Sequence, residues 1–147
     1  MNTMIDRRRL LAAGLAAAAA LLAPRVRACE FFTPTLRVTH PWTRVTAADA
    51  PYAVICMKFD DVSSADRLIG VITPVASGAE IGSPDGVRGL DLALAPGQEM
   101  LLTETGTHVR LTGLRQPLEL GRVYPMKLVF ERSGVLNAQL SVDFEPA

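Results

Sequence analysis

The feature that most constrains the fold is a series of short apolar runs in which hydrophobic and polar residues alternate between turn signals. Successive side chains of a β-strand point to opposite faces, so a period of two predicts strands with one buried face. After residue 28, no stretch of ten or more residues keeps the 3.6-residue apolar period of an amphipathic helix. We therefore expect an all-β protein with strands at residues 35–39, 52–59, 67–73, 78–81, 89–94, 99–103, 108–114, 124–131 and 136–144.

Turn residues punctuate these runs. Pro84-Asp85-Gly86, Ala95-Pro96-Gly97 and Arg132-Ser133-Gly134 supply either a fixed proline φ or a glycine that accepts positive φ. Many short strands at this spacing favour a β-sandwich. The sequence has no internal repeat and no linker of biased composition, so we expect one domain spanning residues 29–147.

The N-terminal residues are expected to form an export signal. Arg7-Arg8-Arg9 precede an apolar run over residues 10–23, and Val26-Arg27-Ala28 follow it, which is the order of zones in a signal peptide. Residues 6–11 also resemble a twin-arginine signal. The apolar run is shorter than the roughly 20 residues of a membrane-spanning helix, so we predict cleavage before Cys29, no membrane span and a periplasmic location.

Charge argues against nucleic acid as a partner. Of 15 basic and 15 acidic residues, five bases and one acid lie in residues 1–28, which leaves 10 bases and 14 acids in the rest. The remaining Lys and Arg residues are scattered singly rather than clustered. A negatively charged domain of this kind has no electrostatic footprint for nucleic acid.

Both cysteines follow the predicted signal, and three interpretations stay open. An oxidising compartment permits a Cys29–Cys56 disulfide. Alternatively, Cys56 is a small buried residue in an apolar strand and Cys29 is free. In the third interpretation, Val26-Arg27-Ala28-Cys29 acts as a lipoprotein cleavage box and Cys29 carries a lipid.

Several phrases resemble the PCu(A)C family of periplasmic copper chaperones. They include His40-Pro41-Trp42-Thr43-Arg44, the stretch from Gly106-Thr107-His108 to Thr112-Gly113-Leu114, and Pro117-Leu118-Glu119-Leu120-Gly121. The resemblance covers nearly all of the chain after the signal. It implies a cupredoxin-like β-sandwich that binds Cu(I) and delivers it to a cuproprotein such as an oxidase.

The resemblance also implies a copper site of histidines and methionines, which suit Cu(I) because thioether sulfur is a soft ligand. Most of these ligands are missing here. The closing His-x-Met element reads His108-Val109-Arg110, the earlier Glu-Leu-His reads Glu80-Ile81-Gly82, and no methionine lies in residues 82–90. His108 is therefore the one candidate metal ligand.

Other donors do not complete the set. A simple hairpin between residues 99–103 and 108–114 would pair Thr103 with His108 and place Met100 on the apolar face as a core residue. Met57 and Cys56 are adjacent in a strand and point to opposite faces. His108 itself is expected on the polar face, next to the Arg110 cation, which opposes metal binding.

Two functions remain after catalysis is set aside. The sequence has no nucleophile elbow, no His-Glu-x-x-His stretch and no phosphate-binding glycine loop, so we expect no enzyme activity. The first hypothesis is a copper-chaperone-like carrier. The second is a metal-free interaction protein on the same fold, which binds its partner through residues 80–90 and the face of His108, Arg110 and Thr112. Neither hypothesis fixes the oligomeric state.

Overall fold

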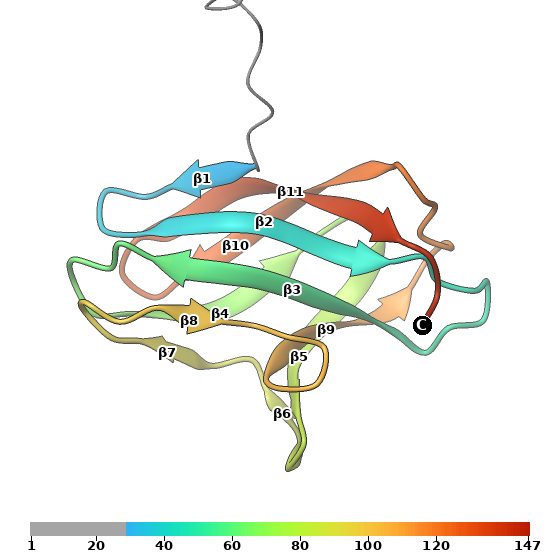
Figure 1. Cartoon of the computed structure of the whole chain (residues 1–147), viewed down its shortest axis with the longest axis horizontal. Coiled ribbons are helices and arrows are strands. Elements are labelled where there is room, and N and C mark those ends of the chain that lie inside the picture. The colour runs from blue at the N-terminus through green and yellow to red at the C-terminus, as the bar shows by residue number, and fades with distance from the viewer. Residues whose placement is uncertain (1–28) are drawn as a thin grey trace, which may run out of the picture.

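The computed structural model describes residues 29–147, which fold entirely into strands and connecting turns (Figure 1). The predicted signal, residues 1–28, lies outside the described residues. The strands are β1 (Glu30–Phe32), β2 (Arg37–Arg44), β3 (Tyr52–Asp60), β4 (Asp66–Ile72), β5 (Ala76–Ser83), β6 (Gly86–Gly89), β7 (Leu92–Leu94), β8 (Met100–Leu101), β9 (His108–Leu114), β10 (Val123–Phe130) and β11 (Gly134–Phe144). No helix long and apolar enough to cross a membrane occurs in residues 29–147.

The strands form one continuous, curled path that folds into two facing layers. Its order is β6-β5-β9-β3-β2-β11-β10-β4-β7, with β1 added beside β2 and β8 beside β3. Neighbours pair antiparallel except β2 and β11, which run parallel with Ser141 opposite Trp42. An isolated bridge between Thr73 and Ala76 links the ends of β4 and β5, so the two layers approach each other there.

Strand β3 belongs to both layers. Its first half pairs with β9, with Ile55 opposite Val109, and its second half pairs with β8, with Lys58 opposite Leu101. Figure 1 shows β3 running along the front of the molecule with β9 and β8 at different points of its length. Consequently β8 and β9 lie in different layers, although only a short loop separates them in sequence.

The core lies between the layers and is built from the inward-facing residue of each alternating pair. Phe59 and Phe130 meet edge to face with ring centroids 6.3 Å apart, and both side chains are almost completely buried. Such aromatic pairs contribute about 0.5–1.5 kcal/mol beyond the area that they bury. On β9, Val109 and Leu111 are fully buried, so His108 and Arg110 lie on the opposite, outer face.

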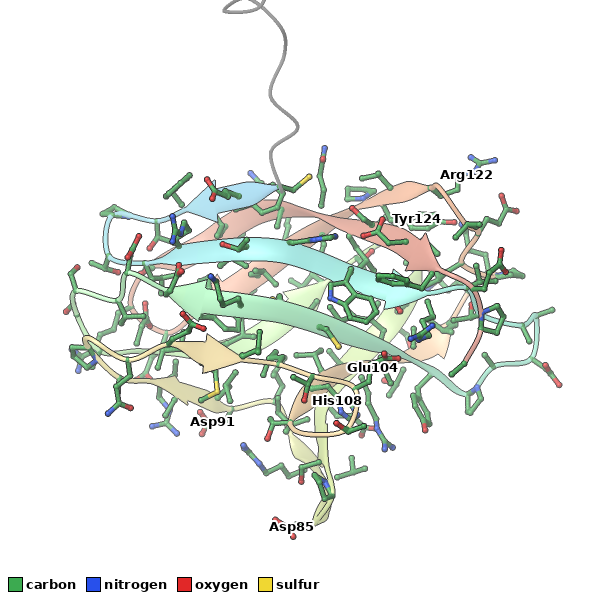
Figure 2. All side chains as sticks on the ribbon, in the orientation of Figure 1. Asp85, Asp91, Glu104, His108, Arg122 and Tyr124 are labelled. Atoms are coloured by element: carbon green, nitrogen blue, oxygen red, sulfur yellow. The ribbon has the colours of Figure 1, made fainter. Side chains whose placement is uncertain are left out.

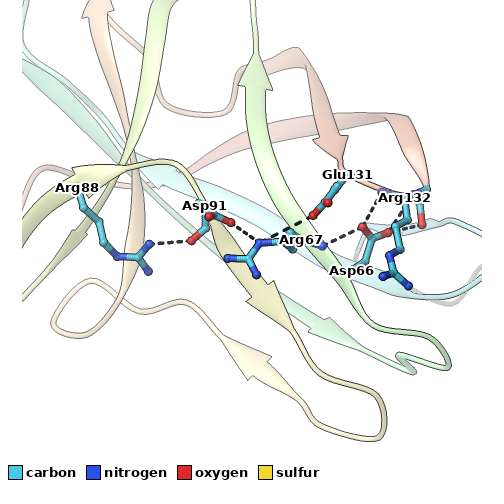
Figure 3. A network of polar contacts seen from close by, with 7 residues as sticks. Asp66, Arg67, Arg88, Asp91, Glu131 and Arg132 are labelled. Carbon is cyan, nitrogen blue, oxygen red and sulfur yellow. Dashed lines mark hydrogen bonds and ion pairs between the residues drawn. The ribbon is translucent and has the colours of Figure 1, made fainter.

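A buried carboxylate ties β4 to the β10–β11 turn (Figure 3). Asp66 is 4% exposed, and its oxygens accept hydrogen bonds from the backbone N–H groups of Arg67, Arg132 and Ser133 and from the Ser133 hydroxyl, at 2.6–3.0 Å. Burial alone would raise the pKa of this carboxyl, but the four hydrogen bonds outweigh burial and hold its pKa below the usual value. The charge thus fixes the turn in which Gly134 takes a φ of 78°.

The sequence predictions agree with most of this architecture. The all-β class and the strand at residues 108–114 are confirmed, and the other predicted strands overlap observed ones. Strands β1 and β6 were not predicted, because both are short edge strands with little apolar alternation. The predicted hairpin between residues 99–103 and 108–114 is wrong, since β8 pairs with β3 in the other layer.

Candidate functional site

The retained histidine lies on the outer face of the layer formed by β5, β9 and β3. In this layer Gly82 is directly opposite His108, and Glu80 is directly opposite Arg110. On the other side of β9, Tyr52 pairs with Thr112. Residues opposite each other in a sheet project from the same face, so these side chains form one surface. Figure 2 shows His108 beside the loop that carries Glu104.

His108 lies on the outer face of β9 beside Arg110, as the sequence predicted, but it is buried there by its neighbours. Its side chain is covered so that the residue is only 5% exposed. One ring nitrogen, Nδ1, lies 3.0 Å from the carbonyl oxygen of Gly106 in the preceding loop. The other, Nε2, lies 3.2 Å from the Nε atom of Arg110. Both nitrogens of the imidazole therefore already have partners.

These two contacts select one tautomer of the His108 ring. A guanidinium has donors and no acceptor, so Arg110 must donate and Nε2 must accept. The proton of the neutral ring then sits on Nδ1 and is donated to the Gly106 carbonyl. The lone pair that a metal ion would need is thus directed at Arg110.

Gly82 makes this arrangement sterically feasible. A Cβ atom built on Gly82 would overlap His108 Nε2 and would lie 2.5 Å from Arg110 Nε. Any side chain at this position would displace the histidine, the arginine or both. The position at which the family pattern has a histidine is thus filled by the side chains of His108 and Arg110.

Arg110 is held on a second side by an aromatic ring. The central carbon of its guanidinium lies 4.2 Å from the centroid of the Tyr52 ring, which is the geometry of a cation–π contact. Within residues 29–147, no carboxylate oxygen lies within 4.0 Å of its guanidinium nitrogens. Arg110 is therefore a fixed, half-buried cation without an acidic partner in the described part of the chain.

An ion pair lies beside this surface. Arg44 binds Glu104 through two hydrogen bonds of 2.7 and 3.0 Å, which join β2 to the loop before β9. The hydrogen bonds from Arg44 hold the pKa of Glu104 below its usual value. Beneath them, burial raises the pKa of the Cys56 thiol to about 11. Cys56 is a neutral, buried thiol, and Cys29 is an exposed one. Both are free, so the structure contains no Cys29–Cys56 disulfide.

The remaining soft or nitrogen donors lie elsewhere. Met57 and Met126 are buried in the core. Met100 packs against the core, which agrees with the predicted apolar environment of Met100. His40 lies on β2, where its Nε2 atom is 2.5 Å from an Asp143 oxygen. The described residues contain no group of three or more His, Cys, Asp or Glu side chains arranged to hold a metal. As they stand, these residues do not fit the copper site that the family pattern implies.

His108 and Arg110 were singled out from the sequence. The contact of Tyr52 with Arg110 and the hydrogen bond from Arg110 to His108 Nε2 were not predicted. The loss of a family histidine at Gly82 was visible, whereas its steric consequence depends on the β5–β9 register. Tyr52 gave no signal, because only the pairing of β3 with β9 brings it to Arg110.

Comparison with known families shows to which family the chain belongs. The family model described as "Putative lipoprotein LpqE-like" matches residues 36–142. The chain belongs to the LpqE-like family. Among curated proteins, none matches this sequence.

Solved structures similar to this LpqE-like protein include PCuAC domains in copper-bound and apo forms. The copper-bound PCuAC domain from PmoF2 superposes with a TM-score of 0.72 at 24% identity, over 79% of this chain and 98% of that one. The apo PCuAC domain from PmoF1 gives 0.71 at 27% identity, over 79% and 99%. Copper(I)-bound DR1885 from Deinococcus radiodurans gives 0.60 at 19% identity, over 80% and 81%. The predicted cupredoxin-like sandwich of the PCu(A)C type is confirmed.

Proposed function

We propose that this LpqE-like protein is an exported, copper-chaperone-like binding protein that serves a cuproprotein such as an oxidase. The observation that carries the proposal is its superposition on the copper-bound PCuAC domain from PmoF2, together with the histidine retained on β9. It acts by binding rather than by catalysis. The structure offers an ordered protein surface and one imidazole for this role, not a complete set of copper ligands.

Export and a periplasmic location belong to the same proposal. They are supported by the signal-like order of residues 1–28 and by the lipoprotein description of the family. Cleavage before Cys29 would leave that cysteine at the N-terminus of the mature protein. Its exposed position at the start of the described residues is compatible with either a free terminus or a lipid anchor.

A second candidate function is favoured by the geometry around His108. If Arg110 keeps hold of Nε2, the protein is a metal-free interaction protein on the same fold. Copper would then have to displace a hydrogen-bonded cation and would gain a single imidazole ligand. Cu(I) sites in proteins need several soft or nitrogen donors, so this exchange is unfavourable.

A competition experiment separates the two candidates. The domain spanning residues 29–147 is titrated with Cu(I) against a chromophoric chelator, beside His108→Ala and, as a control, His40→Ala. Femtomolar to picomolar retention that His108→Ala abolishes and His40→Ala preserves would support the chaperone and exclude the metal-free candidate. Absence of retention by the unmodified domain would exclude Cu(I) carriage by this chain alone.

A further inference from the structure

We infer that Arg110 is a binding site for a carboxylate group, on the face of β9 where the resemblance to the PCu(A)C family implies metal ligands. The inference rests on the second candidate function, the metal-free interaction protein, and names the chemical class of its ligand. The binding itself requires no copper. It rests on the orientation, burial and missing partner of the Arg110 side chain.

The side chain is already ordered for binding. His108 Nε2 accepts from Nε at 3.2 Å, and the Tyr52 ring lies 4.2 Å below the guanidinium carbon. The entropy of fixing a long side chain usually reduces what an exposed ion pair contributes. The Arg110 guanidinium is already ordered in the folded protein, because His108 on β9 and Tyr52 on β3 both contact it. A ligand therefore loses little further side-chain entropy on binding. A ligand would meet a guanidinium in a set plane.

The donors that remain suit a carboxylate. With Nε engaged, the two terminal nitrogens make no hydrogen bond to any group in residues 29–147. A planar guanidinium presents parallel N–H bonds that match the two oxygens of a carboxylate, and such pairs are stronger than neutral hydrogen bonds.

Among the basic residues of the described range 29–147, Arg110 alone is both half-buried and without an acidic partner. Arg37, Arg44, Lys58, Arg67 and Arg122 each have an acidic partner. The other basic residues without one, Arg88, Arg115, Lys127 and Arg132, are exposed. Glu80 is directly opposite Arg110 on β5 yet forms no ion pair with it, so it is the natural competitor of an incoming carboxylate.

The test is a titration followed by nuclear magnetic resonance on the copper-free domain of residues 29–147. Acetate is the first probe, and a blocked peptide with one glutamate is the second, at constant ionic strength because salt screens exposed charges. We expect saturable shifts of the Arg110 side-chain N–H signals and the Tyr52 and Gly82 amides. Tighter binding of the peptide than of acetate would indicate an acidic segment as the source, and equal binding a small acid.

Variants assign the effect to Arg110. Arg110→Gln should weaken binding about tenfold or more, since it removes a charge-assisted pair. Arg110→Lys, which keeps the charge but loses the planar fork, should also bind less tightly than the unmodified domain. Glu80→Gln should tighten binding about twofold or more. Arg115→Gln, an exposed arginine on the segment after β9, is the matched control and should change nothing.

Several results would overturn the inference. They are shifts at Arg110 no larger than those at Arg115, equal binding by the Arg110→Gln variant, or tighter binding of inorganic phosphate than of either carboxylate. Folding of each variant is verified from the dispersion of its spectrum. A failure to bind carboxylates would not change the outcome of the Cu(I) competition, so the two proposals can fail separately.

Discussion

Gly82 and His108 face each other across β5 and β9, and the missing Cβ of Gly82 makes room for the imidazole and for Arg110 above it. Three residues thus form one unit: a glycine that leaves space, a histidine that accepts, and an arginine that donates. The unit occupies the face at which the family pattern has its metal ligands. A change in any member is therefore expected to alter the other two.

Substitution of Gly82 by alanine should break this unit. The added Cβ would overlap His108 Nε2, and because His108 is buried it has little room to move. We expect a loss of about 1–2 kcal/mol in the free energy of unfolding, measured by urea denaturation. Gly89→Ala is the matched control, since nothing lies within 4 Å of its Cβ. Equal stability of the two variants would contradict the packing described here.

Replacing Arg110 by methionine should improve Cu(I) binding. The change frees the lone pair of His108 Nε2, removes a cation and adds a thioether two residues from the histidine. We expect the Cu(I) affinity to rise about tenfold or more in the chelator competition, and to fall again when His108→Ala is added. Arg115→Met serves as the control. An unchanged affinity would show that other missing ligands, not Arg110, limit the site.

Asp66→Asn should destabilise the fold by about 2–3 kcal/mol, because an amide cannot accept all the hydrogen bonds that the buried carboxylate accepts. Asp85→Asn, on an exposed turn, is the control. The comparison is made by urea denaturation at neutral pH.

The same carboxylate predicts a pH dependence. The pKa of Asp66 is lower in the folded state than its unfolded value of about 3.9. Its contribution is therefore complete above the unfolded pKa and is lost as the pH falls through the folded pKa. Stability measured from pH 7 into the acid range should fall less steeply in Asp66→Asn than in the unmodified domain. Parallel curves would argue against a lowered pKa.

The two cysteines should differ sharply in reactivity. Cys29 is exposed, whereas Cys56 is buried and its thiol has a pKa of about 11, so little thiolate forms at pH 8. In the domain of residues 29–147, a chromogenic disulfide reagent should modify one thiol quickly and the second only after denaturation. Cys29→Ser should abolish the fast phase. A chain with no reactive thiol before reduction would instead indicate a disulfide.

The sequence predicted the fold better than the site, and β9 shows why. Its alternation places Val109 and Leu111 inward, so both its bounds and its faces followed from local pattern. Its partners did not, because the loop before it crosses from one layer to the other and leaves β8 on a different part of β3. The sequence likewise predicted, through the resemblance to the PCu(A)C family, that ligands are missing at Gly82 and Arg110. The occupied Nε2 atom was not predicted, since it depends on side-chain packing across three strands.

The parallel pair of β2 and β11 has a consequence for how this chain is made. Strand β11, the most C-terminal of the described strands, fits between β2 and β10 near the middle of the path. Until it arrives, β10 and residues 42–44 of β2 carry unpaired backbone donors and acceptors along one edge, which invites association with other chains. A nascent or C-terminally clipped chain is thus an open sheet rather than a smaller version of the protein. Closure of the sheet between β2 and β10 therefore requires that β11 has been synthesised.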